Sequence, residues 1–236
     1  MKLKCFVFIG VLFVGGIQIA VAQSRAAVDL RSNLGMYSGD LLNFYNEVSR
    51  NKMMEPFDLT EIDGSPYLDN EFKKGNVITK DSVQYAGLEL RYNIYNDALE
   101  FRKNDLDIEL NENFPLLYAV VGDDVFVKAS NAAGYFQVVQ TGDAFLVKKI
   151  KVKFVDRKEA TGYQAAKKPS FKLLKPDYFV EKELSGEAFR VESNEDLLRI
   201  FSDRQDEIET YFKKEKIKVS KESDLIKFWD YYNSIK

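Results

Sequence analysis

Apolar and polar residues alternate most regularly between residues 83 and 103 of this chain. Leucine, tyrosine and isoleucine at positions 88, 90, 92 and 94 alternate with glutamate, arginine and asparagine at 89, 91 and 93. This period of two is typical of a strand with one buried face. Asn96-Asp97 then supplies two residues that tolerate positive φ, as a short hairpin loop requires. The stretch therefore predicts a β-hairpin.

The register of this hairpin follows from the length of its loop. A two-residue loop places Ile94 opposite Leu99 and Tyr92 opposite Phe101, so that both strands present the same apolar face. The same register sets Arg91 opposite Arg102, a like-charge pair that disfavours it slightly.

Further strands are predicted between residue 57 and about residue 189. The alternating or continuously apolar segments are 57–62, 72–79, 106–110, 116–121, 125–128, 135–140 and 144–155, with 178–182 and 188–192 as edge strands. Short strands separated by glycine-containing turns favour an antiparallel sandwich, barrel or strongly curved sheet.

The C-terminal end changes to a helical period. Ser193-Asn194-Glu195-Asp196 has the spacing of a capping box and predicts a helix start. A second helix is predicted over 203–216, and Ser220 is a candidate cap for a third. A short helix is also expected from Ser38. The predicted fold is α+β: a mainly antiparallel, strongly curved or barrel-like sheet (53–192), followed by helices packed on it (193–236).

The N-terminal 22 residues have the pattern of a secretory signal peptide. Lys2 and Lys4 precede an apolar run that ends in Ala20-Val21-Ala22, a small-x-small cleavage site. The alternative, an uncleaved anchor, is disfavoured because glycines and Gln18 interrupt the run, which is shorter than the ~20 apolar residues of a span. Residues 23–52 then form an N-terminal segment. We expect an exported protein of the periplasm or the outer membrane, with no transmembrane span after cleavage.

Composition excludes several kinds of chemistry. The chain has no histidine, and its single cysteine, Cys5, lies within the predicted signal peptide. Serine-histidine and cysteine-histidine catalysis and histidine or thiolate metal sites are excluded in their usual forms. No glycine-rich phosphate loop occurs, and we expect no cofactor. A net charge of −3 argues against a nucleic-acid partner.

The remaining options are carboxylate chemistry, serine-lysine chemistry, or binding without catalysis. Ser49 and Lys52 have serine-x-x-lysine spacing, but the companion motifs of the penicilloyl-serine enzymes are absent. The acidic stretch 104–124 holds Asp105, Asp107, Glu109, Glu112, Asp123 and Asp124. Such oxygen clusters can hold calcium, and two of them could form a glycosidase pair. The stretch lacks EF-hand spacing, so we favour a solvated strand face and expect no metal site.

Basic residues are concentrated in a different stretch. The bases between 148 and 175 are Lys148, Lys149, Lys151, Lys153, Arg157, Lys158, Lys167, Lys168, Lys172 and Lys175. Alternation places Lys149, Lys151 and Lys153 on one strand face, which makes them candidates for binding anionic headgroups or a negative protein partner. The alternative is an ordinary solvated face neutralised by the acidic stretch.

Aromatic residues make up 14% of the chain. Tyr85, Tyr92 and Tyr95 are candidates for lining a carbohydrate or lipid pocket, although aromatic residues on strands usually fill the core.

Three segments carry a resemblance to a known group of proteins. They are the hairpin stretch from Tyr85 to Phe101, the turn Gly64-Ser65-Pro66-Tyr67-Leu68, and the closing Tyr231-Tyr232-Asn233. They resemble exported proteins widespread in Bacteroidota genomes, over most of the chain after the signal. The resemblance implies an envelope location, and it implies no activity and no catalytic residue.

These observations favour a non-catalytic binding or structural protein of the periplasm or the inner face of the outer membrane. Its expected partner is a lipid or an envelope protein. A lipid or acyl chain held by the sheet would require an apolar cavity of several hundred Å³. The alternatives are a carboxylate-based glycan hydrolase and a protein-interaction module that uses the basic strand face. The oligomeric state has no signature in the sequence.

Overall fold

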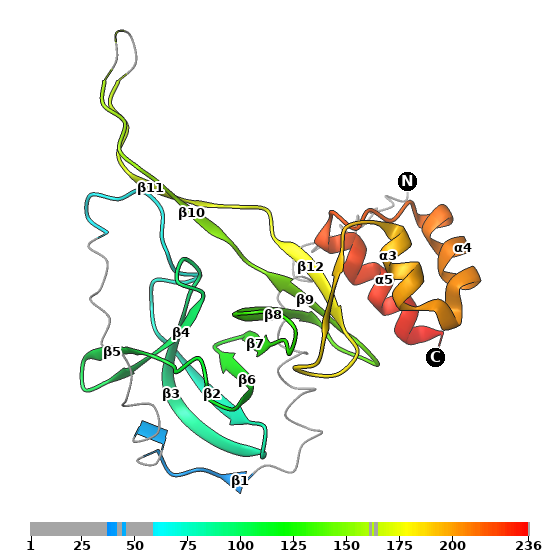
Figure 1. Ribbon diagram of the computed structural model, residues 1–236, viewed down its shortest axis with the longest axis horizontal. Helices are drawn as coiled ribbons and strands as arrows, with labels where there is room; N and C mark the ends of the chain where they lie inside the picture. The colour runs from blue at the N-terminus through cyan, green and yellow to red at the C-terminus, as the bar shows by residue number, and fades with distance from the viewer. Residues whose placement is uncertain (1–36, 42–43, 46–58, 161, 163–164, 236) are drawn as a thin grey trace, which may run out of the picture.

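The computed structural model describes residues 37–41, 44–45, 59–160, 162 and 165–235. Among these residues, one large, mainly antiparallel sheet is followed by helices at the C-terminal end, so the fold is α+β as predicted (Figure 1). Ten strands run in the order β13-β12-β9-β8-β7-β6-β2-β3-β4-β5, and β1 pairs in parallel with β3 off this path. The strands are β1 Tyr37–Ser38, β2 Lys73–Thr79, β3 Val83–Asn93, β4 Ala98–Lys103, β5 Leu106–Glu109, β6 Leu116–Val121, β7 Asp124–Lys128, β8 Tyr135–Gln140, β9 Phe145–Lys149, β12 Asp177–Glu181 and β13 Ala188–Val191.

The sheet is open. β13 and β5 stand at the two ends of the strand order and do not pair with each other, and the sheet is not strongly curled. The expectation of a strongly curved or barrel-like sheet is therefore wrong. Closure requires the two terminal strands to pair, and alternation along single strands carries no information about that pairing.

The hairpin of β3 and β4 has a different register from the predicted one. Its loop spans four residues, 94–97, so Leu90 lies opposite Phe101 and Arg91 lies opposite Glu100. The backbone N–H groups of Ile94 and Tyr95 both donate to the carbonyl of Pro66, which draws Ile94 out of the strand ladder. The wider loop replaces the unfavourable Arg91–Arg102 pair with an ion pair between opposite charges.

Arg91 is the centre of a buried polar cluster. Its Nη2 and Nε donate to Oε2 of Glu100 at 2.6 and 3.1 Å, and Nη2 also reaches Asp107 at 3.2 Å. Its guanidinium lies 3.6 Å from the ring centroid of Tyr67, and Nδ2 of Asn93 donates to the second oxygen of Glu100 at 2.8 Å. Arg91 is 7% exposed and Glu100 1%. A buried ion pair is tolerated when its remaining lone pairs and protons find partners, and here they do.

A β-bulge at Gly87 explains why the alternation of β3 changes phase. Gly75 lies opposite Leu88 and Asn76 lies opposite Ala86, so Gly87 is an extra residue in β3, with φ +75°. Tyr85 and Leu88 consequently reach the same core cluster despite their odd spacing. Glycine adopts this backbone conformation without the steric cost that a side chain would add.

The predicted strand 144–155 is two strands in two sheets. β9 ends at Lys149, and β10 (Val152–Val155) pairs with β11 (Ser170–Leu173) in a separate two-stranded sheet. β11 was not predicted. The predicted strand 57–62 is also wrong where the structure describes it, because Leu59–Ile62 contains a turn.

The C-terminal helices are α3 (Asn194–Ile200), α4 (Gln205–Glu215) and α5 (Glu222–Ser234). α3 begins with the predicted capping box between Ser193 and Asp196. A 3₁₀ turn, η1 (Ser202–Arg204), precedes α4, and the N-cap of α5 is Lys221 rather than Ser220.

The helices pack on β8, β9, β12 and β13 through one shared apolar cluster. Trp229 of α5 is fully buried there and its Nε1 donates to the carbonyl of Ala144 at 3.0 Å. A second cluster lies under β3, β4 and β6. A third contains Ile78 and Tyr118, whose strand neighbours Val77 and Ala119 belong to the second cluster, so these two clusters occupy opposite faces.

Several predictions concern residues outside the described ranges. They are the signal peptide 1–22, most of the segment 23–52 and the Ser49–Lys52 spacing. Of the helix expected from Ser38, the structure describes helical backbone at Leu41, Phe44 and Tyr45.

Among the helices that the structure describes, none has both the length and the apolar character needed to cross a membrane.

The Glu100→Ala substitution tests the Arg91 cluster. It leaves a buried guanidinium with Asp107 as its remaining carboxylate, so we expect the free energy of unfolding to fall by about 3 kcal/mol, the low end for a broken buried pair. Urea denaturation measures this change. Glu89→Ala removes an exposed carboxylate from β3 and should change stability by less than about 0.5 kcal/mol; equal effects of the two substitutions would contradict the assigned role.

Candidate functional site

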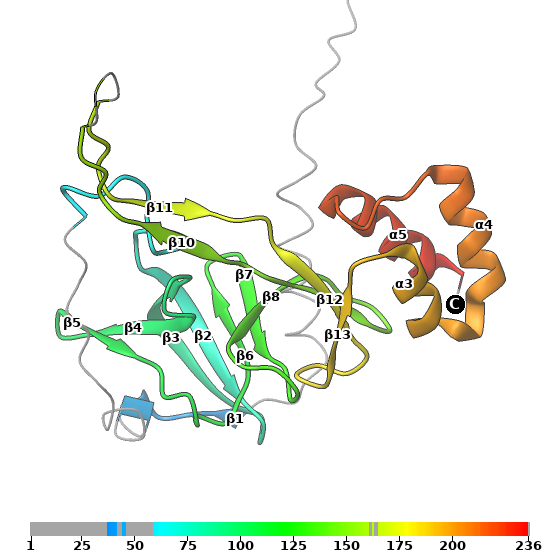
Figure 2. The ribbon, with the colours of Figure 1, turned by 45° about the horizontal axis from the view of Figure 1, so that its top comes forward.

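A basic two-stranded hairpin projects from the body of the protein, and we call its described residues, 151–160, 162 and 165–175, the basic arm (Figures 1 and 2). It holds eight basic and two acidic residues, in a chain whose net charge is −3. Lys153 lies opposite Lys172 in the ladder of β10 and β11, and Lys158 lies opposite Lys167 in an isolated antiparallel bridge further along. The arm thus presents two like-charge pairs across its strands.

Aromatic packing and a backbone bridge hold the root of the arm against the body. The rings of Phe154 and Phe171 lie 5.0 Å apart, and that of Phe171 lies 5.3 Å from Tyr95 in the β3–β4 loop. Asp63 exchanges backbone hydrogen bonds with Pro169 and Phe171. A side chain at Gly64, where φ is +80°, would collide with the carbonyl of Phe171. Two isolated strands are marginally stable, so these contacts explain why the arm forms.

The three predicted binding lysines do not share one free face. Nζ of Lys149 lies 2.6 Å from Oδ2 of Asp97 and donates to the carbonyl of Ala133. Lys151 forms an ion pair with Asp177. Lys153 is exposed and forms no ion pair within the described part of the chain. Two of the three candidates are thus bound within the protein by carboxylates that are distant along the chain.

Asp97 joins the body to the base of the arm. Its Oδ1 accepts from the hydroxyl of Tyr92 at 2.8 Å and from the backbone N–H of Tyr135 at 3.0 Å, while Oδ2 faces Lys149. Burial raises the pKa of Tyr92 above its ordinary value, and the charge and hydrogen bond of Asp97 raise it further, so the phenol keeps its proton. Both oxygens of Asp97 are therefore engaged in structural contacts.

The other bases of the arm divide into weakly paired and unpaired groups. Arg157 lies 3.2 Å from Glu159, and Lys168 lies 3.8 Å from Glu61, both on exposed side chains where ion pairs contribute little. Within the arm, five exposed lysines have no carboxylate of the described residues within 4.0 Å: Lys153, Lys158, Lys167, Lys172 and Lys175. These lysines are the available charge of the arm.

The three candidate tyrosines do not converge on one pocket. Tyr85 is 6% exposed and packs against Phe44. Tyr92 is 2% exposed with its ring 4.6 Å from that of Phe126. Tyr95 is 45% exposed at the root of the arm. The first two belong to the core, and the third supports the arm.

The acidic stretch provides no cation cage where the structure describes it. The carboxylate of Asp107 is bound by Arg91 and Arg102. Within the described ranges, no group of three or more cysteine, aspartate or glutamate side chains is arranged to hold a metal ion.

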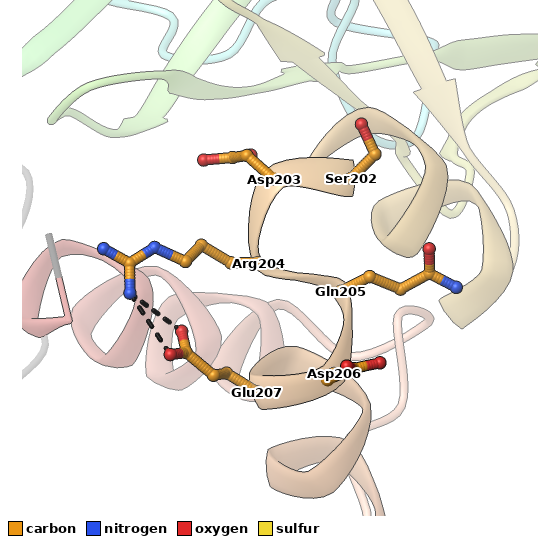
Figure 3. A pocket seen from close by; sticks show the side chains of 6 residues that line it. All are labelled: Ser202, Asp203, Arg204, Gln205, Asp206 and Glu207. Carbon is orange, nitrogen blue, oxygen red and sulfur yellow. Dashed lines mark hydrogen bonds and ion pairs between the residues drawn. The ribbon is translucent and has the colours of Figure 1, made fainter.

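A shallow hollow of about 520 Å³ lies at the start of α4 (Figure 3). Residues 202–207 line it, and Arg204 is bound there by Glu207 at 3.0 Å. The labelled side chains point in different directions in Figure 3 rather than towards one point. A neighbouring hollow shares Ser202 and Gln205 with it. Neither has the convergent polar groups of a small-molecule site.

Glu181, at the end of β12, is a buried carboxyl that sequence analysis did not identify. It is fully buried; Oε2 accepts from the backbone N–H of Ser185 at 3.1 Å, and Oε1 has no hydrogen-bond partner among the described residues. Burial raises the pKa of Glu181 to about 7, against a smaller lowering by the Ser185 hydrogen bond. Glu181 faces the protein interior and not a described hollow.

The protein has no match among protein-family models, curated proteins or solved structures. Any role of the basic arm is therefore argued from the structure of the arm alone. The cluster of bases was recognised in the sequence. The hairpin was not predicted, because the four residues of β11 are too few to establish a period.

The pH dependence of stability tests Glu181. Because the folded state raises its pKa from 4.5 to about 7, the folded state holds a proton that the unfolded state releases between these values. Stability therefore falls as pH rises through this window. We expect Glu181→Gln to match the parent near pH 4 and to exceed it by roughly 2–3 kcal/mol at pH 8, measured by urea denaturation. A stability difference that does not change with pH would contradict this.

Proposed function

We propose that this protein is an exported, non-catalytic binding protein that docks on a negatively charged partner in the cell envelope through the basic arm. The observation that carries the proposal is the pair of facing, unpaired lysines, Lys153 and Lys172, on a hairpin that projects from the body. Export rests on the signal pattern of residues 1–22, and the resemblance to exported Bacteroidota proteins agrees with it.

Like charges directly opposite each other on adjacent strands destabilise the pairing. At Lys153–Lys172 and Lys158–Lys167 the arm retains such repulsion twice, with no carboxylate from the described residues placed to relieve it. An anionic group that bridges the two ammonium groups of a pair removes the repulsion and gains two charge-assisted contacts. The arrangement is suited to an external anion.

The body supports the same proposal through its own ion pairs. Lys148, Lys149 and Lys151 are bound by Glu222, Asp97 and Asp177, so the basic character nearest the sheet is neutralised internally. The pKa of Asp177 lies below its ordinary value: partial burial opposes the shift, and the contacts with Lys151 and Arg190 outweigh it. The basic stretch is therefore neutralised where it leaves the sheet, whereas five of the described lysines further along the arm form no ion pair.

The alternative functions draw less support from the described residues. A lipid held inside the sheet calls for an enclosed apolar cavity, whereas the hollow at residues 202–207 is lined by polar side chains. A glycan hydrolase calls for two carboxyls facing each other across a cleft, whereas Glu100 and Asp107 are bound by Arg91. No described observation favours either function.

Cation exchange tests the docking role of the arm. Although the net charge is −3, we expect the exported chain to bind a sulfonate resin at pH 7.5 and low salt, because the arm concentrates positive charge. Lys153→Gln/Lys172→Gln should elute at a clearly lower salt concentration than the parent.

The matched control changes two exposed lysines of α4. Lys213→Gln/Lys214→Gln alters the net charge equally, and these side chains lie beside Glu209 and Glu215. This variant should elute with the parent. Passage of the parent through the resin without binding, or equal shifts for the two variants, would overturn the proposed docking role.

A further inference from the structure

We infer that the partner of the arm is the anionic headgroup surface of a phospholipid membrane, contacted by the arm face that carries Lys153, Lys172 and Leu174. This inference rests on the proposed docking function and specifies the chemistry of the partner.

The geometry of β10 and β11 assembles this face. Lys153 and Lys172 are opposite each other, so their side chains lie on the same side of the hairpin. Leu174 follows Lys172 by two residues and so returns to that side, and its backbone N–H donates to the carbonyl of Lys151 at 2.9 Å. Phe154 and Phe171 occupy the other side and contact Tyr95. The lysine face is consequently directed away from the body.

The exposure of Leu174 favours a membrane over a soluble polyanion as the partner. Leu174 is 41% exposed on the hairpin side that carries Lys153 and Lys172. A soluble polyanion offers charge to the lysines and no apolar environment to Leu174. A bilayer surface offers both, because the aliphatic stems of lysine and a leucine side chain enter the boundary of the acyl chains while the ammonium groups stay among the phosphates.

The distribution of charge orients the protein on such a surface. The arm carries more bases than acids, whereas the chain as a whole carries an excess of acids. An anionic membrane therefore attracts the arm and repels the rest of the body, within a range of roughly 10 Å set by ionic screening. Because the opposite side of the hairpin packs on Tyr95, the lysine face can approach the surface with the body behind it.

Vesicle sedimentation tests the inference. We expect the exported chain to co-sediment with vesicles of phosphatidylcholine and phosphatidylglycerol and to stay in solution with pure phosphatidylcholine. Each lysine near an anionic surface contributes about 1 kcal/mol, so Lys153→Gln/Lys172→Gln should lower the partition coefficient roughly 30-fold. Lys213→Gln/Lys214→Gln should leave it unchanged.

A second pair of variants tests the apolar contribution. Leu174→Ser should lower partitioning onto the anionic vesicles roughly threefold to tenfold while leaving retention on the sulfonate resin unchanged. Leu106→Ser removes a similarly exposed leucine, 46% exposed, from the edge strand β5 and should change neither. Circular dichroism confirms that all four variants fold.

The outcomes separate this inference from the proposed function. Retention on the resin without vesicle binding, or vesicle binding that Leu174→Ser leaves unchanged, overturns the membrane as partner and leaves the docking role intact. If soluble polyphosphate binds the parent tightly while anionic vesicles do not, the partner is a polyanion instead. Failure to bind both resin and vesicles overturns both proposals.

Discussion

The buried pair of Arg91 and Glu100 is the interaction on which the central hairpin depends. Charges with exposures of 7% and 1% are stable only when every donor and acceptor is satisfied. Glu100 from β4, Asp107 from β5 and the carbonyl of Asn70 before β2 all supply partners to Arg91. One side chain thereby ties together strands and a loop that are distant in sequence, and any other register of β3 and β4 would separate the pair.

That register also determines where the basic arm begins. The four-residue loop that follows from it brings Tyr95 to Phe171 and Asp97 to Lys149. One contact holds the root of the arm by aromatic packing, and the other holds the end of β9 by an ion pair. The loop between β3 and β4 thus links the core of the sheet to the candidate docking element, together with the backbone bridge from Asp63.

Local patterns predicted local structure well. The capping box at Ser193, the strand 116–121 and the strand 135–140 were all confirmed, because each depends on neighbouring residues. The predictions that failed depend on distant partners. Closure of the sheet depends on its two terminal strands. The hairpin loop has four residues rather than the predicted two because Pro66 accepts two hydrogen bonds from it. Residues 144–155 form two strands rather than one because β10 pairs with β11. Lys149 and Lys151 are likewise bound by distant carboxylates, so the candidate site was predicted only as a charge cluster.

The position of Trp229 has a practical consequence. It is the only tryptophan in the chain, and it is buried where α5 meets the sheet, with its indole nitrogen bound to Ala144. Its fluorescence therefore originates from the boundary between helices and strands, and from no other region. A red shift in its emission would report that the helices have separated from the sheet, while changes confined to the arm would leave the signal unaltered. The molecule thus contains an intrinsic optical probe that distinguishes detachment of its helices from movements elsewhere.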